Sequence, residues 1–138
     1  MAFEVRRVRS VRRVVEKELS KRERQDYDAA VADLKGRGCR AGGHRLADVT
    51  GGDYPLCARH LYGEWRMFTA YPDSATVVIV AVDRHTESSN PAGKLSEVFP
   101  GLSPTGRRRS DKPPCCDDPS KPPQVSPALR EALPNVFA

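Results

Sequence analysis

The fold is decided by the stretch Tyr54–Glu87, which reads YPLCARHLYGEWRMFTAYPDSATVVIVAVDRHTE. Val, Ile, Tyr, Phe and Trp dominate three runs within it, and the pairs Gly63-Glu64 and Pro72-Asp73 separate these runs. Runs of β-branched and aromatic residues divided by tight turns are typical of an antiparallel meander. The last run, Thr76 to Val82, is almost continuously apolar, which predicts a central strand that is buried on both faces.

The residues before the meander are predicted to form a short strand and two helices. Phe3 and Val5 would share one face of the strand. Apolar residues then recur at helical spacing in two segments, with Val11, Val14, Val15 and Leu19 in the first and Tyr27, Ala30, Val31 and Leu34 in the second. The second helix is expected to begin at Ser20, because Ser20 and Glu23 have the spacing of a capping box, and to end at Gly36 and Gly38. Residues 39–53 are Gly-rich and predict a long loop around Leu46 and Val49.

These patterns predict an α+β fold, in which the N-terminal strand and the two-helix hairpin pack on a small, mainly antiparallel sheet. This domain would span residues 1–102, with a short helical turn at Lys94 to Phe99. From residue 103 the chain is rich in Pro, Ser, Lys and Asp and poor in large apolar residues, which predicts a disordered tail over residues 103–138. Within the tail, a brief amphipathic helix is expected from Ala128, Leu129, Ala132 and Leu133.

The charge of the chain is concentrated at its N-terminus. The sequence has 23 basic and 18 acidic residues, a net charge of +5. Residues 1–24 contain nine Arg or Lys and four Glu, so this segment carries the whole excess. Such a face attracts polyanions or acidic proteins, although it is equally typical of solvated helix faces. No apolar run is long enough to span a bilayer and no signal peptide precedes the basic start, so we expect a cytoplasmic protein with no membrane partner.

The four cysteines match neither a disulfide scaffold nor a zinc site. Cys39 and Cys57 are isolated in the sequence and are predicted to be ordinary small apolar residues. Cys115 and Cys116 are adjacent in the proline-rich tail, where metal binding or oxidation is the alternative to no role at all. The sequence therefore predicts no metal and no cofactor.

The cations of the meander are the candidate functional residues. Cleaving RNA without a metal needs a base for the 2′-hydroxyl, cations that stabilise the pentavalent phosphate, and an acid for the departing oxygen. Arginine grips two phosphate oxygens at once, and histidine transfers protons near neutral pH. Arg59 and His60 end the first strand, Arg66 lies on the next, and Arg84 and His85 end the third. In a meander these positions can converge on one face.

Each candidate also has a purely structural interpretation. Arg59 and Arg66 can line the solvent face of the sheet, His60 can be an exposed loop residue, and Trp65 can belong to the core. In the functional interpretation, RNA would be bound by Arg12, Arg13, His60 and Trp65.

Three blocks of the sequence carry a resemblance to a known family. They are Tyr54 to Arg59, the segment Gly63-Glu64-Trp65-Arg66-Met67-Phe68, and the run Val77 to His85. Together with the order of strand, two helices, Gly-rich loop and meander, they resemble the RelE/ParE superfamily of bacterial type II toxins over residues 3–99. The resemblance implies a metal-independent mRNA endoribonuclease that acts on the ribosome and is neutralised by a cognate antitoxin.

The resemblance also assigns roles to residues. Arg59 and Arg66 match the arginines of the family, and Arg84 and His85 fall on its terminal basic pair, so the three arginines would hold phosphate and His85 would transfer protons. The chain departs from the pattern at Pro55 and Cys57, where lysines are expected, and at Pro91, which lies near an expected tyrosine. Two alternatives therefore remain: a ParE-like toxin that binds DNA gyrase without cleaving anything, and a degenerate member that binds only RNA or protein.

Overall fold

The computed structural model describes residues 2–47, 53–85, 95, 114–118, 120–123, 125 and 127–133. The described part is an α+β fold with a five-stranded mixed sheet, which confirms the predicted class. Its elements are β1 (Glu4–Arg7), α1 (Arg9–Lys17), α2 (Lys21–Arg37), the 3-10 helix η1 (Gly38–Ala41), β2 (His44–Ala47), β3 (Asp53–His60), β4 (Trp65–Asp73), β5 (Thr76–Arg84) and α4 (Pro127–Ala132).

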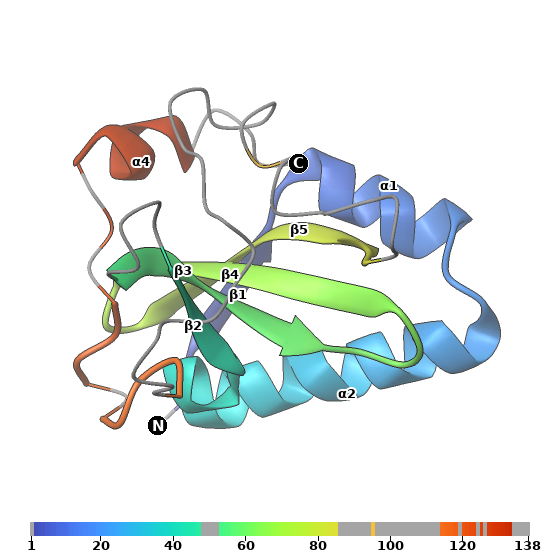
Figure 1. Ribbon diagram of the computed structural model, residues 1–138, viewed down its shortest axis with the longest axis horizontal. Helices are drawn as coiled ribbons and strands as arrows, with labels where there is room; N and C mark the ends of the chain where they lie inside the picture. The colour runs from blue at the N-terminus through green and yellow to red at the C-terminus, as the bar shows by residue number, and fades with distance from the viewer. Residues whose placement is uncertain are drawn as a thin grey trace.

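The sheet has the strand order β1-β5-β4-β3-β2. β1 pairs with β5 in parallel, and every other neighbouring pair is antiparallel. The predicted meander is therefore β3-β4-β5. β5 lies between β1 and β4, and Val77 to Val80 on it are all buried, as its continuous apolar run predicts. In Figure 1 the sheet separates α2 from α4.

α2 begins as its sequence predicts. The Ser20 hydroxyl accepts the Glu23 N–H at 3.2 Å, and the Glu23 carboxylate accepts the Ser20 N–H at 2.8 Å, so both halves of the capping box are present. Tyr27, Ala30 and Leu34 form the buried stripe of the helix. The helix ends at Gly38, whose φ of 59° lies in the left-handed region that glycine adopts without strain.

The segment after α2 differs from the predicted loop. Residues 38–47 contain η1 and β2, and β2 pairs with β3 as an edge strand of the sheet. Leu46 is fully buried, as the prediction required, whereas Val49 lies outside the described residues. The strand was missed because it is only four residues long and its sequence, HRLA, shows no clear alternation.

Both faces of the sheet carry buried apolar residues. The face toward α2 carries Trp65 and Met67, which are 3% and 0% exposed. On the opposite face, Leu56, Phe68 and Val78 are equally buried. Two side chains from the C-terminal part of the chain, Leu95 and Leu133, are also buried in this core. Of the turn predicted at Lys94 to Phe99, only Leu95 belongs to the described residues.

The C-terminal segment is fastened to the domain by two disulfides. Cys39 pairs with Cys116 and Cys57 pairs with Cys115, so the prediction that Cys39 and Cys57 are unpaired apolar residues is wrong. The described residues of the tail also differ from the predicted disorder, because Cys115 is fully buried and α4 forms at the expected place. The composition gave the wrong prediction because two disulfides attach this segment to the domain, although it has little apolar surface to bury.

Candidate functional site

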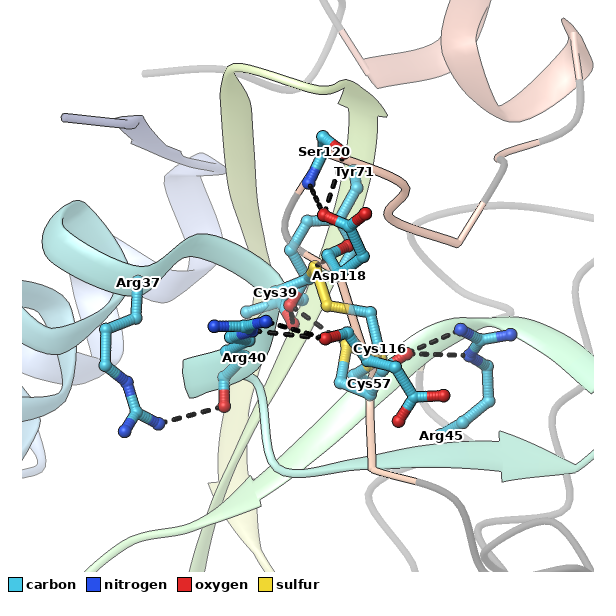
Figure 2. The surroundings of a disulfide bond; sticks show 12 residues. Arg37, Cys39, Arg40, Arg45, Cys57, Tyr71, Cys116, Asp118 and Ser120 are labelled. Atoms are coloured by element: carbon cyan, nitrogen blue, oxygen red, sulfur yellow. Dashed lines mark hydrogen bonds between the residues drawn. A yellow bond between two sulfur atoms is a disulfide. The ribbon is translucent and has the colours of Figure 1, made fainter. Parts of the chain in front are cut away.

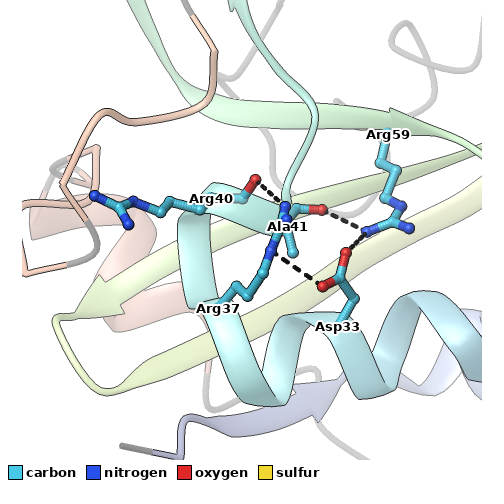
Figure 3. A network of polar contacts seen from close by, with 5 residues as sticks. All are labelled: Asp33, Arg37, Arg40, Ala41 and Arg59. Carbon is cyan, nitrogen blue, oxygen red and sulfur yellow. Dashed lines mark hydrogen bonds and ion pairs between the residues drawn. The ribbon is translucent and has the colours of Figure 1, made fainter.

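Arg59, the first predicted phosphate ligand, is bound within the protein. Its Nη1 donates to Asp33 Oδ2 of α2 at 2.7 Å and to the Ala41 carbonyl oxygen at 2.9 Å. Asp33 also pairs through Oδ1 with Arg37 Nε at 3.1 Å. Figure 3 shows this network joining β3 to the end of α2. The contacts give Arg59 a structural role on the α2 face of the sheet.

Trp65 and Arg84 are register partners and lie on the same α2 face. The Trp65 indole N–H donates to Glu23 Oε2 at 2.8 Å, and the Arg84 guanidinium lies 5.0 Å from the centre of the Trp65 ring. The hydrogen bond from the Ser20 backbone N–H, together with that from the indole, lowers the pKa of Glu23. Because Trp65 is 3% exposed, its ring is covered and does not present a surface on which a base can stack.

A second group of polar residues crosses the opposite face of the sheet. In the register, Arg66 on β4 lies between His60 on β3 and Asp83 on β5. Side chains of directly paired residues share a face, and that face alternates with each residue along a strand. The three residues therefore form one cross-strand row, on the side away from Arg59 and Arg84. We call His60, Arg66 and Asp83 the polar row.

His44 of β2 extends the polar row toward the edge of the sheet. Its ring centre lies 5.9 Å from that of His60, with the two rings nearly perpendicular. His44 is the register partner of Ala58, which has the same face as His60. Sequence analysis missed His44 because it lies in the segment predicted to be a loop, where no strand pairing is expected.

Arg66 is the cation at the centre of the polar row. Its Nη1 donates to the carbonyl oxygens of Trp65, at 2.9 Å, and Gly63, at 3.3 Å, which holds the side chain against the β3–β4 turn. A guanidinium carries five N–H donors, so these contacts through one nitrogen leave others that can bind an anion. Because Arg66 lies beside His60 and close to the β3–β4 turn, its guanidinium is suited to bind a phosphate oxygen.

His85 lies next to the same turn. It follows the last residue of β5, its side chain is exposed, and its backbone N–H donates to the Glu64 carbonyl oxygen at 2.8 Å. Of the four predicted catalytic residues, the fold thus divides Arg59 and Arg84 from Arg66 and leaves His85 at the end of the sheet beside the β3–β4 turn.

The predicted RNA-binding arginines of α1 lie apart from the polar row. Arg12 forms an i,i+4 ion pair with Glu16, with 3.1 Å between Nε and Oε1. Arg13 is exposed on the same helix. Arg12 faces an open groove of about 540 Å³ beside β1, which also contains Arg6, Arg7 and Arg24.

A further group of polar contacts surrounds the two disulfides Cys39–Cys116 and Cys57–Cys115 (Figure 2). Cys115 donates its backbone N–H to the Gly43 carbonyl oxygen at 2.9 Å, and its own carbonyl oxygen accepts from Arg45 Nε at 3.1 Å. Arg40 Nη2 donates to the Asp117 carbonyl oxygen at 2.9 Å. The Tyr71 hydroxyl lies 3.3 Å from Cys115 Sγ, and complete burial raises the pKa of Tyr71. These contacts hold the tail segment in place.

Gly42 makes this close packing possible. A Cβ at this position would lie 2.2 Å from Tyr71 Oη and 3.0 Å from Cys115 Sγ. The pair Gly42-Gly43, which suggested only a loop in the sequence, therefore marks the point where the tail approaches the backbone of the domain.

The described residues contain neither a cluster that could hold a metal ion nor a helix that could span a membrane. No group of three or more His, Cys, Asp or Glu side chains there is placed to hold a metal ion. No helix in the described part is both long and apolar enough to cross a membrane.

Comparison with known proteins gives no assignment: no family model, curated protein or solved structure matches this chain. The RelE/ParE resemblance therefore rests on the sequence blocks and the order of the elements alone.

Proposed function

We propose that the protein is a type II toxin of the RelE/ParE kind that cleaves mRNA on the ribosome and is neutralised by a cognate antitoxin. The observation that carries the proposal is the polar row, in which His60 and Arg66 are register partners and His44 lies beside His60. Two imidazoles can serve as base and acid, and the guanidinium between them and the turn can hold the scissile phosphate. No metal is needed for this chemistry.

The order of the elements supports the same proposal. In the described part of the chain a strand, two helices and a three-strand meander occur in the order on which the family resemblance depends, but η1 and β2 stand where that order has a Gly-rich loop. The roles of the candidate residues change, while the order of the elements is kept. Arg66 keeps its proposed role at the phosphate, His60 and His44 take the proton transfers first assigned to His85, and Arg59 and Arg84 have structural contacts instead.

Two observations favour the alternative of a non-catalytic toxin. Arg59 is bound to Asp33 and Ala41, and Cys57, at a position where the family has lysine, is in a disulfide. Both positions are thus used to hold the domain together, and fewer cations remain for a phosphate.

The disulfides also bear on the predicted cytoplasmic location. Disulfides persist in oxidising compartments and are rare in the cytosol, where the ribosome works. The proposal therefore requires that the two disulfides persist in the cytoplasm, because a chain without them would lose most of its stability. Rapid alkylation of thiols in intact cells, followed by mass measurement, reports which state the working protein has.

Mapping of mRNA 5′ ends after induced expression tests the function. Removing a general base or acid lowers the rate by about 100-fold or more. We expect that loss for His60→Gln, and a loss of about 100-fold or more for Arg66→Ala, because it removes electrostatic stabilisation of the transition state. Arg84→Ala is the matched control, because it removes a guanidinium from the other face of the same sheet, and its cleavage should remain within about three-fold of the wild type.

The other results would each contradict the proposal in a different way. Loss of cleavage in Arg84→Ala but not in Arg66→Ala would move the site to the α2 face. Growth arrest with damaged DNA and intact mRNA would establish the gyrase alternative. Normal growth on induction would eliminate both toxin functions.

A further inference from the structure

Tyr62 is the one large apolar side chain in the described part of the chain that is exposed, at 47%. It lies in the β3–β4 turn between Leu61, which is buried, and Gly63, whose φ of 67° lies in the left-handed region. The Leu61 N–H donates to the Trp65 carbonyl oxygen at 2.9 Å, and the Trp65 N–H donates to that of Tyr62 at 3.4 Å. These bonds close the turn, so the Tyr62 side chain is held outside the core at a fixed place.

The Tyr62 ring lies beside a cation. The Arg22 guanidinium of α2 is 4.9 Å from the centre of the ring, which is within the range of a cation–π contact. The neighbouring pair of Arg84 and Trp65 has a similar separation of 5.0 Å, but the Trp65 ring is covered. Of these two rings, Tyr62 is therefore the one with a surface on which a further planar group can stack.

A cation lies on each side of this turn. Arg66, on the face of the sheet away from α2, donates from Nη1 to the Gly63 carbonyl oxygen at 3.3 Å. Arg22 belongs to α2, which covers the other face. Proteins that bind single-stranded nucleic acid combine exposed aromatic rings with cations, because every base has a π-face and every phosphate is negative. The β3–β4 turn has both components.

We propose that Tyr62 stacks on an unpaired base of single-stranded RNA, with Arg66 and Arg22 at the two phosphates that flank this base. Each nucleotide within a strand has a phosphate on either side, which matches one cation on either side of the ring. This inference rests on the proposed function, because Arg66 is the cation assigned there to the scissile phosphate. Tyr62 takes the stacking role that the sequence suggests for Trp65.

Binding of a 2′-O-methylated single-stranded RNA of about eight nucleotides to the full chain tests the proposal. Methylation blocks the hydroxyl that attacks the phosphate, so binding is measured apart from cleavage. Tyr62→Ala should weaken binding about ten-fold, the size of one lost base stack, and Tyr62→Trp should retain it. Tyr62→Leu should bind as weakly as the alanine variant, because leucine keeps apolar surface but has no π-face.

Controls separate stacking from charge and from folding. An oligonucleotide with abasic sites should bind the wild type about ten-fold more weakly, and Tyr62→Ala should weaken its binding no further. Arg22→Gln should weaken binding of the intact RNA about three-fold, the size of one exposed charge contact. Lys35→Gln removes an exposed cation near the other end of the same helix and should leave the affinity unchanged. The unfolding midpoint of Tyr62→Ala should equal that of the wild type, because the side chain is exposed.

Three results would overturn the proposal. Unchanged binding in Tyr62→Ala, or no saturable binding by the wild type, would remove the stacking contact even if the chain cleaves mRNA. Binding by Tyr62→Leu as tight as that of the wild type would assign this side chain to an apolar contact. Equal binding of the abasic oligonucleotide would assign the affinity to phosphates alone. Failure of the proposed function looks different, since binding that depends on Tyr62 without any mRNA cleavage would support the stacking site and eliminate the nuclease.

Discussion

Removing the disulfides is the perturbation whose effect on stability is best defined by the structure. Cys57→Ala with Cys115→Ala opens one bond, and Cys39→Ala with Cys116→Ala opens the other. Alanine is the right replacement, because Cys57 and Cys115 are completely buried and serine would bury a hydroxyl group.

The magnitude follows from the loops that the bonds close. Cys57 and Cys115 are 58 residues apart, so this bond alone constrains the unfolded chain by about 4 kcal/mol. The two bonds are coupled, because Cys115 and Cys116 are adjacent. With one bond formed, the second closes only a ring of roughly 20 residues, which adds about 3 kcal/mol.

Each double variant should therefore lose about 3 kcal/mol of unfolding free energy, and the variant without any cysteine about 7 kcal/mol, more than the sum of the two. The larger loss approaches the whole stability of an ordinary domain. Equilibrium unfolding in guanidinium chloride measures these values through the fluorescence of Trp65, the one tryptophan in the sequence.

Reduction of the wild type provides the control, since it should reproduce the variant without cysteines. An unchanged midpoint after reduction, or losses in the two double variants that are far from equal, would refute the reasoning. Either result would mean that the tail is not fastened to the domain by these two bonds.

Three further predictions concern single residues. Gly42→Ala should destabilise the protein by about 2 kcal/mol, measured as a lower midpoint, because its Cβ would overlap the Tyr71 hydroxyl. The pKa of Glu23 is lowered in the folded state, so its contribution to stability is present above the pKa of the unfolded chain and is lost as the pH falls through the folded value. Glu23→Gln should therefore flatten the acid side of the stability–pH curve, and an unchanged slope would contradict this. Arg59→Met should cost about 1 kcal/mol of unfolding free energy with little change in the proposed RNA cleavage, whereas a selective loss of that cleavage would give Arg59 a catalytic role.

The helices and the meander could be predicted because their signals are local. The capping box at Ser20, the apolar stripe of α2 and the turn at Gly63 each depend on residues within one or two turns of each other. Burial of both faces of β5 could be predicted for the same reason, since its run of apolar residues is continuous.

The division of the candidate residues between two faces could not be predicted, because it depends on register. The β3–β4 turn pairs Arg59 with Met67 and His60 with Arg66, so Arg59 and Arg66 fall on opposite faces. A register shifted by one residue would have placed Arg59 and Arg66 on the same face. In β4–β5, a shift between Phe68 and Thr69 changes the pairing again.

The disulfides could not be predicted, because each joins positions 58 or 77 residues apart. Sequence spacing identifies cysteine pairs only where a short motif repeats, and four cysteines allow three connectivities. The adjacent pair Cys115-Cys116 gave no information on which of these connectivities forms.

The disulfide pattern determines when the native cysteine pairs can form during synthesis. Cys39 and Cys57 leave the ribosome well before Cys115 and Cys116, so during synthesis the only partners they have are each other. A chain that stops before Cys115 keeps both thiols without their native partners and lacks the segment that fills the space beside Gly42. The described residues of the tail, from Pro114 to Leu133, are therefore held to the folded domain despite the composition of this segment.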